Sequence, residues 1–312
     1  MSEKRDLNDI LSRLADQFLL RNYDYLYLRA MLDKCASAPE GSTLIVGSSH
    51  ALNGIQESAW HYAVNCSMDS QDIYYDYACA RRAVLSAGKG RFEKCFIVMG
   101  YYIAYQDLSR STVSRETVIS NIYYPIFRDA RHWASPTGRD PWDGFGDIPE
   151  PIKTACEQAA VQKIRECGTY YTSIRPRGTY FDLKGRAWAQ VSPGERRSMG
   201  QVRAESHNKS YRHKESFEEN KGVFQEFIRF LYEHDVMPIV VVTPFTPEYN
   251  RYILPEMKAA VPALLDYVAE DVHFVDFNQG DLFTPEDFMD TDHLSAQGAE
   301  KVSKILVELF GQ

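Results

Sequence analysis

Two short polar segments of this sequence contain the residue types that acyl transfer requires. A Gly-Ser-Ser run at residues 47–49 directly follows an apolar run, and Asp290 and His293 lie three residues apart before the last helical pattern. Acyl transfer needs a hydroxyl nucleophile, a base that takes its proton and a carboxylate that orients the base. We therefore predict Ser49 as the nucleophile, His293 as the base and Asp290 as the orienting acid. Each segment is unspecific by itself, so the prediction depends on the fold bringing them together.

Neighbouring residues leave alternatives at each of these positions. Ser48 is a rival nucleophile, and Ser49 could instead cap the following helix, because serine is a preferred N-cap residue. Asp292 could replace Asp290 as the partner of the imidazole, although the three-residue spacing favours Asp290. His50 is either a second acid/base group or a turn residue that contacts the end of the sheet, and we favour the turn residue.

Five short apolar runs are the elements that must position these side chains. Each run ends in a turn, and helical patterns lie between them, which is typical of a parallel sheet with helices on both faces. Ligands of such open sheets bind beyond the carboxyl ends of the strands, where both polar segments fall. The expected strands lie at residues 43–46, 63–65, 95–99, 239–242 and 273–277.

The rest of the chain predicts one large domain with two additions. Leu, Phe and Tyr at helical spacing between residues 5 and 35 indicate a helical leader over 1–40. Residues 41–312 are expected to form a single α/β domain that closes with a helix over 295–310. The stretch 101–205 is rich in Tyr, Trp, Pro, Gly and Arg and has weak periodicity, so we expect an irregular, aromatic-rich insertion that covers the sheet as a lid.

Taken together, these blocks resemble the SGNH, or GDSL-type, hydrolases along nearly the whole chain. Within that superfamily, the runs 47–50 and 65–77 are most similar to the branch found in cell-surface polysaccharide clusters and in the D-alanyl transfer protein of teichoic acid synthesis. The blocks that carry the resemblance are Gly-Ser-Ser after the first strand, Asn65 with Ser67 and Ser70 after the second, Gly100 after the third, and Asp290-x-x-His293 before the last helix.

The resemblance implies a flavodoxin-like three-layer α/β/α sandwich whose serine forms an acyl-enzyme, from which the acyl group passes to water or to a sugar hydroxyl. On the matching positions, Ser49 is the nucleophile, His293 the base and Asp290 the orienting acid. Ser67 and Gly100 match the positions that form the oxyanion hole of the family.

Two departures from the family pattern bear on activity. Ser48 stands where the family has an Asp before the nucleophile, and Tyr102 stands where it has an oxyanion-hole Asn two residues after Gly100. The hole must therefore be completed by other donors, or the activity is reduced. Backbone N–H groups at the turns and the side-chain amide of Gln71 are the donors that we expect there.

A basic segment follows the aromatic stretch. Residues 175–215 contain ten Lys or Arg and four Asp or Glu, a net charge of +6 on a chain whose remainder carries −14. We predict that Arg175 and Arg177 bind an anionic part of the substrate, such as a phosphate, a carboxylate or an acidic sugar. The alternative is a solvated face that docks on the acidic remainder of the chain.

Composition limits the partners. A formal net charge of −8 does not favour nucleic acid or an anionic membrane, and no apolar run is long enough to insert into a bilayer, so we expect a cytoplasmic protein. The six cysteines form no CxxC pair and no zinc-like cluster with histidine, so we expect no metal and no cofactor.

The function expected from sequence is a serine-dependent O-acyltransferase or esterase that acts on a carbohydrate or glycoconjugate, in cell-surface polysaccharide synthesis. A long insertion that excludes water tilts the expectation towards transfer. The alternative is a catalytically silent carbohydrate-binding or scaffold protein that keeps the fold, and phosphoester chemistry is a weaker third.

Overall fold

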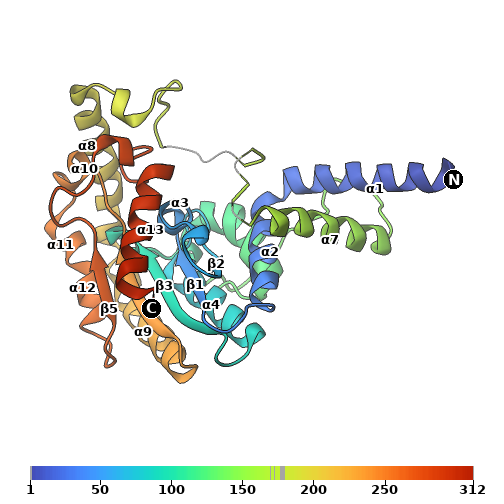
Figure 1. The fold of residues 1–312 in the computed structure, drawn as a ribbon, viewed down its shortest axis with the longest axis horizontal. Coiled ribbons are helices and arrows are strands. Elements are labelled where there is room, and N and C mark those ends of the chain that lie inside the picture. Colours follow the sequence, from blue (N-terminus) through green and yellow to red (C-terminus); the bar gives the residue numbers. More distant parts are fainter. Residues whose placement is uncertain (1, 169, 172, 176–179, 312) are drawn as a thin grey trace. The chain divides into compact units, whose positions relative to one another are not determined.

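The computed structural model describes residues 2–168, 170–171, 173–175 and 180–311, with side chains from residue 7 onwards, and the chain forms two compact units (Figure 1). Unit 1 consists of Met1–Lys34 and Leu108–Arg177. Unit 2 consists of Cys35–Asp107 and Gly178–Gln312. The boundaries expected for the leader, the domain and the insertion stay predictions.

Unit 2 contains a five-stranded sheet in which every neighbouring pair is parallel. The strand order β2-β1-β3-β4-β5 is that of flavodoxin-like folds, so the predicted α/β class with a parallel sheet is confirmed. All five strands coincide with the apolar runs expected from sequence. They are β1 (Ser42–Gly47), β2 (Ala63–Asn65), β3 (Phe92–Met99), β4 (Met237–Val242) and β5 (His273–Asp276).

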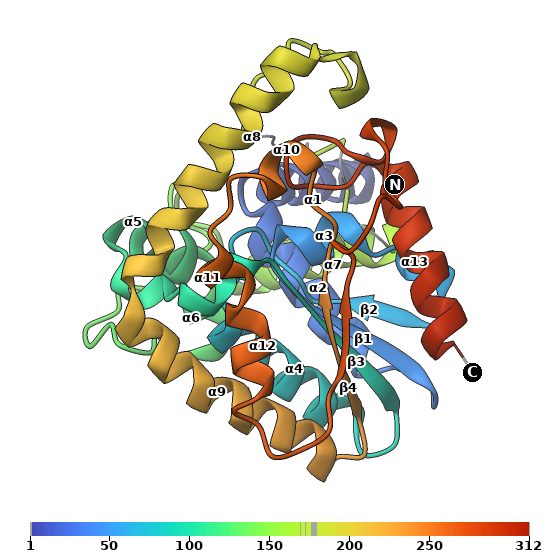
Figure 2. The ribbon, with the colours of Figure 1, turned by 90° about the vertical axis from the view of Figure 1, so that its left-hand side faces the viewer.

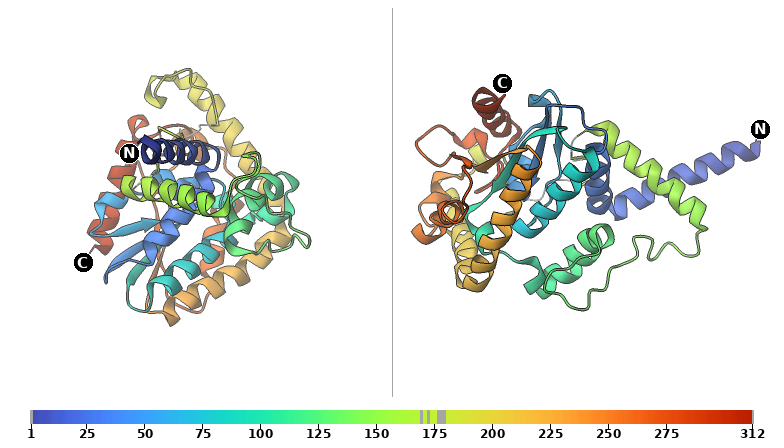
Figure 3. Two further views of the ribbon diagram at one scale, coloured as in Figure 1. Left: turned by 90° about the vertical axis from the view of Figure 1, so that its right-hand side faces the viewer. Right: turned by 90° about the horizontal axis from the view of Figure 1, so that it is seen from below.

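Helices cover both faces of this sheet, with α13 on one face and α4 and α9 on the other (Figures 2 and 3). Alternate strand side chains point to opposite faces, so each face of the sheet buries its own apolar set. The set beneath α13 includes Ile45, Phe96 and Ile239, which pack with Val302 and Leu306. The helices of unit 2 are α3 (Ser49–Gly54), α4 (Ile73–Ala87), α8 (Pro193–Asn208), α9 (Lys214–Glu233), α10 (Pro247–Asn250), α11 (Pro255–Lys258), α12 (Ala260–Leu265) and α13 (Ala296–Phe310).

Unit 1 is helical. Its longest helices, α1 and α7, lie side by side (Figure 3), and the ring of Phe18 stacks on Trp142 with 4.1 Å between centroids. Two helices cover most of residues 2–35. The helices of unit 1 are α1 (Ser2–Arg21), α2 (Tyr23–Cys35), α5 (Thr112–Ser114), the π-helix η4 (Arg115–Tyr123), α6 (Tyr124–Phe127) and α7 (Glu150–Cys167).

The stretch 101–205 is more regular than its sequence suggests, since it contains α7 and most of α8. The buried face of α7 includes Cys156 and Ala160, and that of α8 includes Gly200 and Ala204. Small side chains give a helix little amphipathic contrast, which is why the periodicity was weak. No helix among the described residues is both long enough and apolar enough to cross a bilayer.

Candidate active site

Ser49 lies where β1 turns into α3. The strand ends at Gly47, whose φ is +146° and where a Cβ atom would lie 2.1 Å from the carbonyl oxygen of Val98 on β3. Only glycine fits this close approach. Ser48 is the N-cap of α3, and its hydroxyl accepts from the N–H of His50 at 3.5 Å. The capping role considered for Ser49 therefore belongs to Ser48, and Ser49, the first residue of α3, remains partly exposed.

Asp290 and His293 lie on a turn closed by an antiparallel bridge between Phe288 and Leu294. Asp290 Oδ1 accepts from the backbone N–H of His293 at 2.8 Å and from that of Asp292 at 2.9 Å. The carbonyl of Thr291 accepts from the hydroxyl of Thr246 at 2.8 Å, which ties this turn to the segment after β4. Backbone hydrogen bonds thus fix the position of the Asp290 carboxylate independently of its contact with the imidazole.

The structure brings the three predicted residues into one hydrogen-bonded array. His293 Nε2 lies 2.9 Å from Ser49 Oγ, and His293 Nδ1 lies 3.0 Å from Asp290 Oδ2. Asp290 is fully buried and His293 is 6% exposed, so only the serine end faces accessible space. The array lies beyond the ends of β1 and β3, which is the topological switch point of this strand order.

Asp292 is the other carboxylate beside His293, and it has a different partner. Its Oδ1 lies 3.8 Å from His293 Nδ1, beyond hydrogen-bonding distance. Both of its oxygens accept from Nε of Arg203, at 2.9 and 3.0 Å. The structure therefore pairs Asp290 with the histidine, and Asp292 with Arg203.

These charges set the protonation of His293. Burial disfavours the imidazolium, but the carboxylates of Asp290 and Asp292 outweigh it and raise the pKa of His293 to about 9. Burial likewise opposes ionisation of Asp292, but His293 and Arg203 hold its pKa well below the usual range. The two carboxylates therefore favour the imidazolium form of His293.

Behind His293 lies a buried chain of aromatic and imidazole rings. His50 stacks on His293 with 5.1 Å between centroids, and its Nε2 lies 3.0 Å from the hydroxyl of Tyr102. Tyr102 stacks on His207 at 3.7 Å, and His207 Nδ1 lies 2.8 Å from the hydroxyl of Tyr249. Burial lowers the pKa of His50 to about 3 and that of His207 well below its usual value, so both imidazoles stay neutral.

His50 is therefore not the turn residue that we favoured from sequence. It lies on α3 and is 2% exposed. Its ring fills the space between His293 and Tyr102, and the added Cβ of any residue other than glycine at position 100 would come within 3.1 Å of its Nε2.

The predicted oxyanion-hole residues differ in how their donors are used. Ser67 is fully buried; its N–H donates to Asn65 Oδ1 at 3.1 Å, and its hydroxyl has no partner among the described residues. Gly100 is the buried residue that directly follows β3. The Gln71 amide donates to the carbonyl of Cys66 at 3.3 Å and to Asp76 Oδ1 at 2.7 Å. Both N–H donors of Gln71 are thus used inside the fold, which leaves Ser67 and Gly100 as the candidates.

The basic segment spans both units. Arg203 of unit 2 joins this site through its ion pair with Asp292, and Arg175 of unit 1 lies 3.3 Å from Asp24. Arg177 lies outside the described residues. The substrate-binding role expected for Arg175 and Arg177 stays a prediction.

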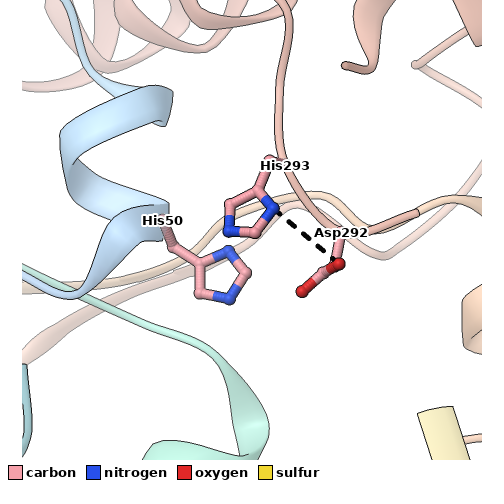
Figure 4. A group of neighbouring side chains, drawn as sticks. All are labelled: His50, Asp292 and His293. Atoms are coloured by element: carbon pink, nitrogen blue, oxygen red, sulfur yellow. Dashed lines mark ion pairs between the residues drawn. The ribbon is translucent and has the colours of Figure 1, made fainter. Parts of the chain in front are cut away.

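A metal ion is the other chemistry that these side chains could support. His50, Asp292 and His293 offer ligand atoms within 4.8 Å of one another (Figure 4). However, Arg203 already occupies the carboxylate of Asp292 and places a positive charge beside the group, and Asp290 occupies His293 Nδ1. The arrangement therefore favours proton transfer over cation binding.

Sequence reasoning missed Arg203 and His207, which approach the site from α8. They share one face of that helix with Gly200 and Ala204, at the i, i+3, i+4, i+7 spacing. A Cβ atom on Gly200 would lie 2.6 Å from the backbone of Glu248 on α10, so the helix is held close. The helical spacing of these small, cationic and imidazole residues is the pattern in the sequence that could have indicated a buried functional face.

No family model matches this chain, and no curated protein is significantly similar to it in sequence. The class that the structure defines is therefore an α/β fold with a five-stranded parallel sheet, and its function must be argued from the site.

Proposed function

We propose that the protein is a serine-dependent acyl ester enzyme, an O-acyltransferase or esterase of SGNH type that acts on a carbohydrate or glycoconjugate. The observation that carries the proposal is the array in which His293 Nε2 lies 2.9 Å from Ser49 Oγ and Nδ1 lies 3.0 Å from Asp290. Nucleophile, base and orienting acid occupy the roles that acyl transfer requires.

In the first half of the reaction, neutral His293 takes the proton of Ser49 as Oγ attacks the ester carbonyl carbon. The Ser67 hydroxyl and the Gly100 N–H are the donors for the oxyanion. His293 then gives its proton to the departing alkoxide as the carbon–oxygen bond of the ester breaks. The acyl group is left on Ser49.

In the second half, water or a sugar hydroxyl attacks the acyl-enzyme while His293 takes its proton. Collapse of the tetrahedral intermediate breaks the bond to Ser49, and His293 returns the proton to Oγ. Hydrolysis and transfer differ only in which hydroxyl reaches the acyl carbon. Asp290 accepts the hydrogen bond from Nδ1 and keeps the ring oriented throughout.

The strand order supports the SGNH assignment. The nucleophile follows β1, the candidate oxyanion donors follow β2 and β3, and the Asp-x-x-His segment precedes α13. This is the same succession of blocks on which the sequence resemblance is based. The carbohydrate part of the proposal depends on that resemblance alone.

Intact-mass spectrometry tests the proposal. The full chain is incubated with a fluorophosphonate and, separately, with p-nitrophenyl acetate, and the adduct is located by peptide mapping. We expect one adduct on Ser49 that is absent from Ser49→Ala and retained in Ser48→Ala, the matched control. Equal labelling of both variants would refute the assignment of the nucleophile. Sugar acceptors added to the acylated protein then separate transfer from hydrolysis.

One observation favours a second candidate, a silent carbohydrate-binding protein. Tyr102 stands where the family has its oxyanion Asn, and its hydroxyl lies 3.0 Å from His50 instead. The side-chain amide of Gln71 also donates to Cys66 and Asp76 inside the fold. A folded protein that forms no adduct and turns over no ester would support this candidate.

A further inference from the structure

Unit 1 contains a cavity of about 320 Å³ that none of the predicted catalytic residues lines. It opens between the junction of α1 and α2, the π-helix η4, and the loop around residues 139–145. Cavities of this size are large enough for a small ligand. All of its lining residues belong to unit 1.

The polar groups of this cavity are balanced in charge, with three arginines and three aspartates among the lining residues. Two of the arginines are held in place before any ligand arrives. Arg21 donates to the carbonyl of Gly144 at 3.3 Å and lies 4.4 Å from the ring centroid of Phe145, and Arg175 pairs with Asp24 at 3.3 Å. Fixed groups of this kind lower the ordering cost of binding.

The balance indicates the kind of ligand. Guanidinium groups only donate hydrogen bonds and carboxylates only accept them, so a ligand that meets both needs groups that do both. Hydroxyl groups meet that need, and the partly exposed ring of Phe145 offers an apolar surface beside them. A multiply charged phosphate gains nothing from a lining without net positive charge.

The helix beside the cavity is unusual. Residues Arg115–Tyr123 form a π-helix, a rare conformation that is found disproportionately at functional sites. Its i to i+5 hydrogen bonding brings Thr117 and Ile122 onto one face, and both line the cavity together with Asn121. The rare backbone and the preorganised polar groups are independent observations that point to the same place.

We infer that this cavity binds a small carbohydrate through its arginine, aspartate and asparagine side chains. The cavity is lined by residues of unit 1 alone, and the inference does not depend on acyl chemistry in unit 2. It would let unit 1 hold a glycan whatever unit 2 does to it.

Saturation-transfer NMR on the full chain tests this inference. The probes are hexoses, N-acetylhexosamines, uronic acids and disaccharides, with inorganic phosphate and ADP as competitors. We expect at least one carbohydrate to show saturation transfer, and neither competitor to displace it. Ser49→Ala should bind it with unchanged Kd, which separates this site from the proposed active site.

Arg139 gives the decisive variant because it lines the cavity and is exposed, so its truncation should leave the fold intact. Arg139→Ala should raise the Kd by about tenfold, as expected for one lost charged hydrogen bond. Arg165→Ala, an equally exposed arginine of α7, is the matched control and should not change it. The inference is overturned if no carbohydrate binds, if phosphate or ADP displaces it, if both arginine variants behave alike, or if Ser49→Ala abolishes binding.

Discussion

The residues on the two sides of His293 differ in where they come from in the chain and in how deeply they are buried. On one side, Ser49 and Asp290 come from short segments next to a strand end and a turn, and the serine is partly exposed. On the other, His50, Tyr102 and Arg203 come from three separate elements and are buried or nearly so. In the proposed mechanism, the first side presents the reacting atoms to a substrate, and the second fixes the charge and position of the imidazole. Substitutions on the first side should therefore lower activity most, and substitutions on the second side should lower stability most.

Loss of the imidazole should have the largest effect, because it belongs to both sides. His293→Ala should lower kcat/KM for p-nitrophenyl acetate on the order of a thousandfold or more, nearly as much as Ser49→Ala, since the two act as a unit. Steady-state kinetics checks this, with Ser48→Ala as the mild control. A loss below tenfold for His293→Ala would remove it from the mechanism.

The two carboxylates separate orientation from charge balance. Asp290→Asn should lower kcat by a factor of about a hundred to a thousand, because the substitution removes the negative charge and can turn an amide NH2, which only donates, towards Nδ1, so the histidine loses its orientation. Asp292→Asn should lower kcat far less. Kinetics on both variants decides the assignment, and a greater loss at Asp292 would reverse it.

Arg203 should matter for stability more than for chemistry. Its side chain is 14% exposed and that of Asp292 is fully buried, so Arg203→Met removes the guanidinium partner of a buried carboxylate. We expect the free energy of unfolding to fall by about 3 to 5 kcal/mol, measured by urea denaturation. Arg203→Met combined with Asp292→Leu should recover much of that loss. No recovery in the double variant would mean that packing, rather than charge, makes Arg203 important.

The raised pKa of His293 predicts an alkaline activity profile. Only the neutral imidazole can take the proton of Ser49, so kcat/KM should rise about tenfold per pH unit and level off near pH 9. Asp290→Asn removes one carboxylate and should move this limb towards lower pH. A wild-type plateau that begins near pH 6.5 would show that the carboxylates do not stabilise the imidazolium.

The raised pKa of His293 also makes stability depend on pH, in the opposite direction to activity: stability falls as pH rises. A folded pKa above the ordinary value of 6.5 gives stability that is complete below that pH and is lost as pH rises through about 9. The difference in melting temperature between wild type and His293→Gln should therefore shrink across this range, as thermal melts at several pH values can show.

The smallest effect should come from Tyr102→Phe, which removes only the hydroxyl beside His50. We expect kcat to fall by a few fold at most, and stability by about 1 kcal/mol. If kcat instead fell a hundredfold or more, the buried chain of rings would take part in the chemistry, and the contrast between the two sides would disappear.

Sequence predicted the reactive side much better than the buried one. The strand that places Ser49 was visible as an apolar run ending at Gly47, and Asp290 and His293, three residues apart, formed a local pattern. Local patterns of this kind survive into the fold because turn geometry is set by nearby residues.

The buried side could not be read in the same way. Arg203 was counted only as part of a basic segment, because its partnership with Asp292 joins residues 89 positions apart. Gln71 looked available for an oxyanion until its contacts with Cys66 and Asp76 were seen. Whether a polar side chain forms its hydrogen bonds inside the fold depends on tertiary packing, which cannot be predicted from one sequence.

The separation of 244 positions between Ser49 and His293 has a consequence for biosynthesis. The ribosome makes the nucleophile early, but β4, β5 and the turn with Asp290 follow only after the second segment of unit 1 has been made. The sheet therefore closes through contacts of high sequence separation, which form slowly. Under the proposed mechanism, a nascent or truncated chain without His293 carries an unactivated Ser49 hydroxyl, so reactivity towards esters would appear only after His293 has been translated.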